Sequence, residues 1–280
     1  MFRRLLKRTY HSPVLNPLRR LYFAGRFFNT YYRRRVGLVV TRSFASPEIT
    51  NFTYDLTGTN RGYLAHLISV VSRQPLAAIQ GYIDEVRGDM ALHGHITAAM
   101  HARGLEMPPH ANPFGRRLGW YALVRALKPG VVVETGVDRG HGSVLLCAAL
   151  LRNAQEGRPG RYFGTDINPQ AGWLLSGRYA ETGKILYGDS IASLSTLNET
   201  IGLFINDSDH SADYEEKEYH IVASKLALDA VLIGDNAHVT DRLMRFAEAT
   251  GRDFLYFQEE PKDHWYPGGG IGVAFPRNPQ

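Results

Sequence analysis

The feature that most constrains the fold is a regular alternation of apolar strands and helical segments that begins near residue 116. Strand-like runs at VVVETG, RYFGTD, KILYGD, IGLFIND and DAVLIGDN are separated by segments with helical character, among them a helix that we expect to start near Pro169. Such alternation predicts a parallel sheet with helices on both faces. DFLYFQE and GIGVAF follow without a long helix between them, so we expect them to pair antiparallel.

The sequence divides into three predicted parts: a basic, aromatic-rich arm (1–45), a helical extension or substrate cap (46–115) and the α/β domain (116–280). Residues 1–42 hold 11 Lys or Arg and no acid, which leaves 21 basic and 27 acidic residues elsewhere. The main body is therefore mildly acidic, and the net charge of +5 does not indicate a nucleic-acid-binding domain.

A helix is predicted in the arm over residues 18–35, with Arg19, Arg26 and Arg33 on one face and Leu and aromatic residues mostly opposite. This pattern is typical of a helix that lies on an anionic membrane surface. A helix docked on its own domain, or a solvated tail, is the alternative.

The single cysteine, Cys147, excludes an internal disulfide and suits a reducing compartment. No apolar run reaches the length of a membrane span, and no secretory signal is visible. We therefore expect a cytoplasmic protein, and peripheral membrane contact through residues 1–35 is one of the interpretations that stay open for the arm. A homo-oligomer stays open.

Two of the apolar runs end in acidic clusters, LFINDSDH (203–210) and AVLIGDN (230–236). Neighbouring strands lie about 4.8 Å apart, so adjacent strands would bring Asp207, Asp209, Asp235 and Asn236 together. Carboxylates that close repel each other unless a cation or a proton lies between them. Alternatively, Asp207 and Asp235 cap the helices that follow.

Three other strand ends carry groups that suit a nucleotide-like ligand. The segment 131–143 places Gly136, Gly140 and Gly142 in a strand–turn–helix unit, although the G-x-G-x-x-G dinucleotide fingerprint is absent. Asp166 could accept both hydroxyls of a ribose, and Asp189 could lie near an adenine amino group. Both could instead cap helices.

Taken together, Glu134, Gly136, Gly140, Asp166, Gly188-Asp189 and the Asp207/Asp235-Asn236 pair resemble class I S-adenosylmethionine-dependent methyltransferases over roughly residues 116–275. Within that class the sequence is most similar to the cation-dependent small-molecule O-methyltransferases. The resemblance implies a Rossmann-like seven-stranded sheet in the order 3-2-1-4-5-7-6 with strand 7 antiparallel, here preceded by an N-terminal helical extension.

The resemblance also implies roles for individual residues. S-adenosylmethionine would be bound by residues that include Glu134, Gly136, Gly140, Ser143, Asp166 and Asp189. Mg²⁺, or Mn²⁺ as second choice, would be bound by Asp207, Asp235 and Asn236. The sequence departs from many relatives at Asp138, where they have Gly, and at Gly142, which shifts the usual serine by one place.

The main hypothesis is therefore cation-assisted O-methylation of a small-molecule or sugar hydroxyl, with Asp207 and His210 as catalytic residues. His210 would be the general base or an outer partner, His238 is the reserve base, and Asp209 takes an outer role. One alternative is a metal-independent O- or N-methyltransferase that uses His210 as base. Another is a nucleotide-binding oxidoreductase or a non-catalytic binding domain. Trp265 and Tyr266 would wall the acceptor pocket or pack as core aromatics.

Overall fold

The computed structural model describes residues 13–45, 50–106 and 114–277. Residues 1–12 of the predicted arm and most of the connector at 108–115 lie outside these ranges. The chain falls into two compact units, Met1–Ser46 with Asp263–Pro267, and Pro47–Lys262 with Gly268–Gln280.

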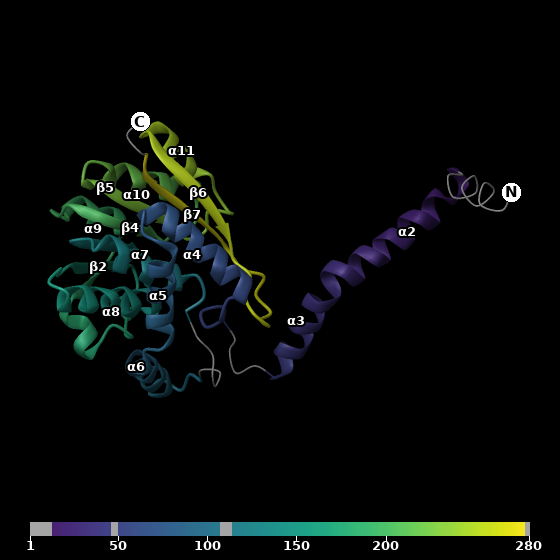
Figure 1. Ribbon diagram of the computed structural model, residues 1–280, viewed down its shortest axis with the longest axis horizontal. Coiled ribbons are helices and arrows are strands. Elements are labelled where there is room, and N and C mark those ends of the chain that lie inside the picture. The colour runs from purple at the N-terminus through teal and green to yellow at the C-terminus, as the bar shows by residue number, and fades with distance from the viewer. Residues whose placement is uncertain (1–12, 46–49, 107–113, 278–280) are drawn as a thin grey trace. The chain divides into compact units, whose positions relative to one another are not determined.

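The first unit is dominated by consecutive helical segments that extend the predicted helix in both directions (Figure 1, purple). Pro17 lies in the first turn, where its missing N–H has no helical partner to lose. Apolar side chains along the run are exposed, including Leu21 at 71% and Tyr22 at 64%. The segments are η1 (Pro13–Leu15), α2 (Asn16–Phe27), the π-helical turn η2 (Phe28–Tyr32) and α3 (Arg33–Ala45).

Within the described residues, no helix combines the length and the hydrophobicity that crossing a membrane requires.

The second unit contains a seven-stranded sheet in the order β3-β2-β1-β4-β5-β7-β6, which confirms the predicted topology. β1 to β5 pair with one another in parallel, whereas β7 runs antiparallel to both β5 and β6. The strands are β1 (Val131–Thr135), β2 (Arg161–Asp166), β3 (Gly183–Tyr187), β4 (Ile201–Asn206), β5 (Leu226–Gly234), β6 (Arg252–Gln258) and β7 (Gly270–Pro276).

Two groups of helices pack in this unit (Figure 1). The first comprises α4 (Gly58–Ser72), α5 (Leu76–Arg87), α7 (Arg117–Leu127) and α8 (His141–Gln155). Helix α6 (Met90–His101) lies near the end of α5. The second comprises α9 (Ser190–Thr196), α10 (Ala212–Ala223) and α11 (Arg242–Ala249). Val131 and Val133 are alternate residues of β1 and point to the same face of the sheet. Both lie in the buried cluster that contains Tyr219 of α10 and Phe246 of α11.

The helix predicted from Pro169 is wrong. The backbone N–H groups of Gly172 and Leu174 donate to the carbonyls of Asp138 and Arg139, at 2.5 and 3.0 Å, instead of to their own segment. Gly172 also adopts a φ of +72°, which does not continue a right-handed helix. Only the short 3-10 helix η3 (Gly177–Glu181) follows.

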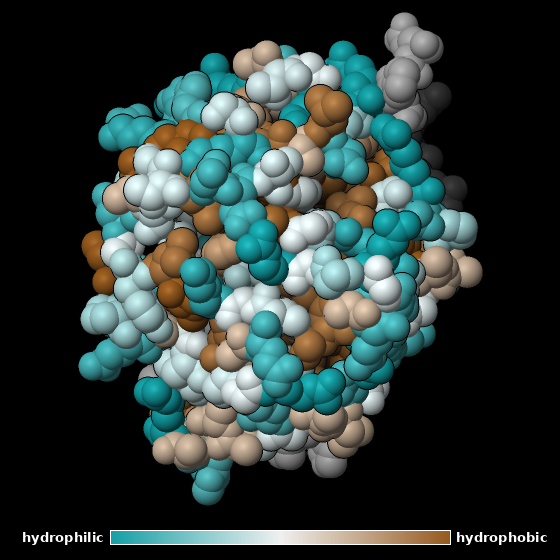
Figure 2. All heavy atoms as spheres, turned by 90° about the vertical axis from the view of Figure 1, so that its left-hand side faces the viewer, coloured by the Kyte–Doolittle hydropathy of each residue, from teal (hydrophilic) through white to brown (hydrophobic). Residues whose placement is uncertain are grey.

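Figure 2 shows one face of the molecule, where polar side chains alternate with small apolar patches and no broad apolar surface is seen.

Candidate active site

The carboxyl ends of the parallel strands place the predicted site residues along one edge of the sheet. Thr135 at the end of β1 pairs with Thr165 of β2 and with Asn206 of β4, and Asn206 pairs with Gly234 of β5. The residues that follow these pairs are Gly136, Asp166, Asp207 and Asp235. The register therefore brings together the glycine turn and the acidic strand ends, as predicted. In open α/β sheets this edge is where ligands bind.

Gly136 is required at its position by both conformation and space. Its φ is +76°, and a Cβ there would lie 2.0 Å from the carbonyl oxygen of Asp207. Gly140, with a φ of +90°, forms the N-cap of α8 and approaches Gly172 closely. The turn between them, in which Asp138 is exposed, leads directly into the N-terminus of α8, where anionic groups are favoured.

Asp166 and Asp189 both make local hydrogen bonds, but only Asp189 caps a helix, since the described residues 167–176, which follow Asp166, form no helix. Asp166 accepts from the backbone N–H groups of Asp138 and Asn168, each at 2.8 Å. Asp138 has a φ of +44°, a conformation that Gly adopts more readily, so Asp166 stabilises the turn at the position of the departure noted above. Asp189 caps α9 through the N–H of Ile191 at 2.7 Å.

Glu134 and Ser143 lie together below the glycine turn. Ser143 donates to Glu134 at 3.3 Å, and Tyr162 donates to the same carboxyl oxygen. Glu134 is 2% exposed, and its burial raises its pKa to about 7 although the hydrogen bonds from Tyr162 and Ser143 oppose the shift. Both predicted cofactor residues thus have protein partners, and their contact with a cofactor stays a prediction.

The acidic pair Asp207 and Asp235 meets a cation that the sequence reasoning missed. Arg116, directly before α7, donates from Nε and Nη2 to the two carboxylate oxygens of Asp235. Burial and the neighbouring Asp235 carboxylate raise the pKa of Asp207 well above its usual range. Burial alone would raise the pKa of Asp235 too, but Arg116 lowers it below its usual value. The repulsion expected between the carboxylates is thus relieved in two ways: the Arg116 guanidinium binds Asp235, and the raised pKa of Asp207 favours its protonated form.

A second acid and a tyrosine complete this group around Arg116. Nη1 donates to the Tyr54 hydroxyl at 2.8 Å and lies 3.5 Å from Glu259, to which Tyr54 donates at 2.5 Å. Tyr54, Arg116 and Glu259 come from three distant parts of the sequence and are all buried. Strand periodicity gives no signal for such a group, since only the fold brings it together.

The residues predicted to bind Mg²⁺ do not fit a metal site as they are arranged. The oxygens of Asp235 accept from Arg116, and the Asn236 amide contacts His210 at 3.0 Å. Nowhere in the described ranges do three or more His, Cys, Asp or Glu side chains form a group that could hold a metal ion. No reaction step is therefore assigned to a metal.

His210 lies in the exposed loop between β4 and α10, beside Asn236 and near the acidic pair. Partial desolvation lowers its pKa from the usual value although Asp235 opposes the shift, which favours the neutral imidazole. Asp209 accepts from the N–H of Ser211 at 2.8 Å, which fits its predicted outer role. His238 is held differently, because its Nδ1 accepts from the Gly270 N–H at 2.9 Å.

A buried carboxyl group that the sequence analysis did not single out joins several strand ends. Glu218 of α10 is 0% exposed and accepts hydrogen bonds from four side chains. The donors are Thr135, Ser190, Asn206 and Ser208. Its burial raises its pKa, which these hydrogen bonds oppose. A glutamate three residues after Glu215 on an otherwise polar helix carries no sequence signal for this role.

The segment before α4 lies over the glycine turn. The Phe52 ring stacks on His141, the first residue of α8, with ring centroids 5.9 Å apart, and the Arg139 guanidinium lies 5.1 Å from the same ring. Trp265 and Tyr266, which were predicted to wall an acceptor pocket, belong to the first unit. Their ring centroids lie 6.2 Å apart there, and the acceptor role stays a prediction.

Comparisons with known proteins agree with this geometry. Residues 133–237 match a family model described as a methyltransferase domain. The cofactor-bound Rv0187 protein from MTB is 19% identical, with a TM-score of 0.51, and the match covers 69% of this chain and 92% of that one. This likeness shows the fold.

Two further solved structures are O-methyltransferases with TM-scores of 0.49. TomG from Streptomyces achromogenes, involved in tomaymycin synthesis and solved with SAM, is 18% identical, with 68% of this chain and 91% of that one covered. The enzyme from Bacillus cereus, solved with SAH, is 16% identical over the same shares of 68% and 91%. The comparison with curated proteins finds no match.

Proposed function

We propose that this chain is a class I S-adenosylmethionine-dependent methyltransferase that methylates a hydroxyl oxygen of a small molecule, which the match of residues 133–237 to a methyltransferase domain supports. One observation carries the proposal: two groups of residues lie side by side at one edge of the sheet. The first is the glycine turn with Asp166 and Asp189, and the second is the acidic loop 207–211, which contains His210. The first group suits the cofactor, and the second suits an acceptor next to it.

In the proposed reaction the acceptor oxygen attacks the sulfonium methyl group in line with the carbon–sulfur bond. The new oxygen–carbon bond forms as the carbon–sulfur bond breaks, and S-adenosylhomocysteine leaves with the electron pair on sulfur. The acceptor proton passes to the neutral imidazole of His210, which Asn236 holds at 3.0 Å. The partial negative charge that develops on the acceptor oxygen lies near the Arg116 guanidinium.

The test is a calorimetric titration of the protein with S-adenosylmethionine, S-adenosylhomocysteine and NAD. We expect both methionine-derived ligands to bind and NAD not to bind. Absence of binding by both would sink the proposal, and binding of NAD alone would favour the nucleotide-binding oxidoreductase. For the base, His210→Gln should lower the rate of methyl transfer about 10²-fold or more while S-adenosylhomocysteine affinity stays unchanged.

Assistance by Mg²⁺ or Mn²⁺, as the sequence resemblance implies, is the competing form of the same reaction. In that form Asp235 would have to release Arg116 before its oxygens could act as ligands. Methyl transfer that stops in EDTA and returns with Mg²⁺ would favour this form. Transfer that continues in EDTA favours the metal-independent form.

We also propose that the first unit binds an anionic membrane surface from the cytoplasmic side. Exposed apolar side chains recur along the whole helical run, and residues 13–45 contain seven arginines and no acid. The apolar set includes Leu18, Leu21, Tyr22, Phe28, Tyr32, Val36, Val39 and Val40. Apolar burial at the interface together with attraction to anionic lipids is the usual basis of such binding.

Cosedimentation with vesicles tests the membrane proposal. Binding should be strong to vesicles that contain anionic lipid and weak to vesicles of neutral lipid alone. Equal binding to both would remove the proposal. Whether the chain forms a homo-oligomer, which the sequence leaves open, can be read in the same preparations by sedimentation velocity without lipid.

A further inference from the structure

We infer that Arg116 is the resident cation of the acidic pair Asp207–Asp235, so that no divalent ion binds between these carboxylates. The inference rests on the proposed function in one respect, namely that this edge receives the acceptor. It assigns Arg116 as a positioning residue, whose fixed guanidinium supplies the positive charge that a metal would otherwise supply.

The contacts of the guanidinium carry the first step. Two of its nitrogens donate to the two oxygens of Asp235, which is the bidentate geometry that suits an arginine and a carboxylate. The third nitrogen donates to Tyr54 and approaches Glu259. The arginine side chain is 10% exposed and that of Asp235 0%, so water does not replace these bonds readily.

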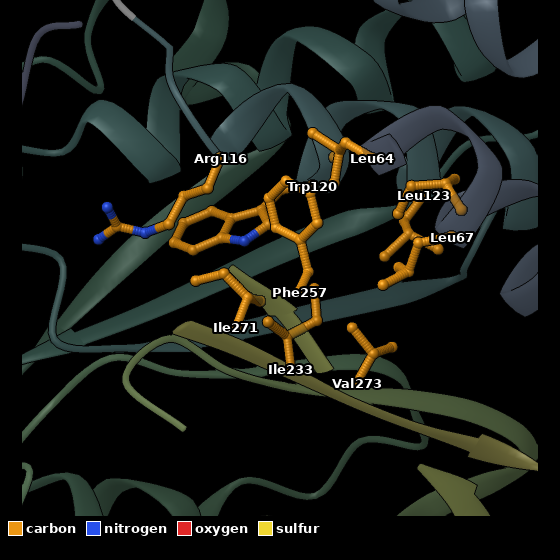
Figure 3. Close-up of a pocket in the computed structure, with 11 residues that line it drawn as sticks. Leu64, Leu67, Arg116, Trp120, Leu123, Ile233, Phe257, Ile271 and Val273 are labelled. Atoms are coloured by element: carbon orange, nitrogen blue, oxygen red, sulfur yellow. The ribbon is translucent and has the colours of Figure 1, made fainter. Parts of the chain in front are cut away.

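The arginine stem is held in place by the core. Figure 3 shows the stem beside Trp120, while the guanidinium points away from the cluster formed by Leu64, Phe257, Ile271 and neighbouring apolar side chains. The cavity among these residues has a volume of about 10 Å³, which leaves no room for the guanidinium to swing inward. The head group is therefore fixed at the acidic pair by packing as well as by charge.

The remaining acceptors around Arg116 are also in use. Glu259 accepts from Tyr54 at 2.5 Å and from the Gly269 N–H at 3.1 Å. Asn236, the third predicted ligand, contacts His210 instead of the acidic pair. A divalent ion placed at Asp235 would stand next to a guanidinium at a largely buried site, where like charges repel strongly.

The experiment measures Mn²⁺ binding by electron paramagnetic resonance in four full-length proteins: wild type, Arg116→Met, Arg116→Met with Asp235→Asn, and Arg125→Met. Arg125 is the matched control, because it is a second buried arginine, at the far end of α7, paired with Glu85 and Glu156 at 2.8 and 2.5 Å. We expect wild type and Arg125→Met to leave the free Mn²⁺ signal unchanged. Arg116→Met should bind one ion per chain, and the double variant should lose it.

Two outcomes would overturn the inference. One is a wild-type protein that binds one Mn²⁺ and loses it on Asp235→Asn, since the ion then displaces Arg116. The other is a folded Arg116→Met protein that binds no ion, since the arginine then occupies no cation site. If Arg116→Met does not fold, Arg116→Lys replaces it, because lysine keeps the positive charge without the bidentate fork and should still exclude Mn²⁺. In that case Mn²⁺ binding by the wild type would still overturn the inference.

The same samples separate this inference from the proposed function. Calorimetry with S-adenosylhomocysteine reports on the cofactor site, which lies on β1 to β3 and does not include Arg116. A wild type that binds neither S-adenosylhomocysteine nor Mn²⁺ contradicts the function and leaves the cation assignment standing. A wild type that binds both contradicts only the cation assignment.

Discussion

Single residues decide how closely the ends of the strands can approach each other. Gly136 is the clearest case, because any side chain there would meet the backbone of Asp207. The sequence indicated a glycine turn at this point, but the partner of the turn becomes known only through the pairing of β1 with β4.

Gly136→Ala should therefore destabilise the protein and abolish cofactor binding. The methyl group adds both an unfavourable left-handed conformation and an overlap with Asp207, which together cost about 2–4 kcal/mol. Gly157→Ala is the matched control, because Gly157 has a similar φ of +77° with open space around it. Urea unfolding should show a loss of only about 1 kcal/mol for the control. Equal losses in both variants would contradict the steric explanation.

Glu134 should make the stability depend on pH. Its pKa is about 7 in the folded protein against 4.5 for a free side chain, so the folded state holds the proton more tightly. Stability from this group is therefore present below about pH 4.5 and is lost as the pH rises to about 7, by about 3 kcal/mol in total.

Urea unfolding at pH 5 and pH 8 checks this expectation. Glu134→Gln cannot ionise, so its stability relative to wild type should rise between the two pH values. Glu181→Gln, at an exposed glutamate, should follow the wild type. A constant difference between wild type and Glu134→Gln would show that Glu134 is already ionised at pH 5.

At the scale of elements, the strands were predictable and some of their neighbours were not. Buried strands leave continuous apolar runs in the sequence, so β1 to β7 were recognised and their order followed from the resemblance. The segment after Asp166 was misassigned, since its N–H groups bond to the glycine turn, a partner that lies outside the local sequence. Arg116 and Glu218 were missed for the same reason.

Glu218 should be the most sensitive position on α10. Glu218→Ala removes the acceptor of three buried donors, from β1, β4 and α9, and of one partly buried donor in the acidic loop. Because buried donors without an acceptor are costly, we expect the free energy of unfolding, measured in urea, to fall by about 2–4 kcal/mol. Glu216→Ala, at a half-exposed glutamate on the same helix paired with Arg242 at 3.3 Å, should cost less than about 1 kcal/mol. Similar losses at both positions would mean that the cluster contributes little.

For the whole molecule, the distribution of charge matters more than its sum. The net charge of +5 combines a basic arm with an acidic body, as the sequence alone indicated. What the arm touches could not be predicted, because an amphipathic pattern fits a membrane and a protein surface equally well.

Replacing Arg19, Arg26 and Arg33 by Gln should weaken binding to anionic vesicles by about 100-fold, at roughly 1 kcal/mol for each arginine. The control replaces Arg158, Arg245 and Arg277, which are exposed arginines of the second unit, and changes the net charge by the same amount. Cosedimentation at low salt provides the measurement. An equal loss in both triple variants would show that total charge, and not the arm, determines binding.

The contact between Gly136 and the backbone of Asp207 also links the two halves of the site thermodynamically. A cofactor that shifts the glycine turn should also shift the acidic loop, where we propose that the acceptor binds, because the two backbones are closely packed. Binding at one half then changes the affinity at the other, and the factor must be the same in both directions. The enzyme should thus favour an order of binding, with the methyl donor preparing the place of its acceptor.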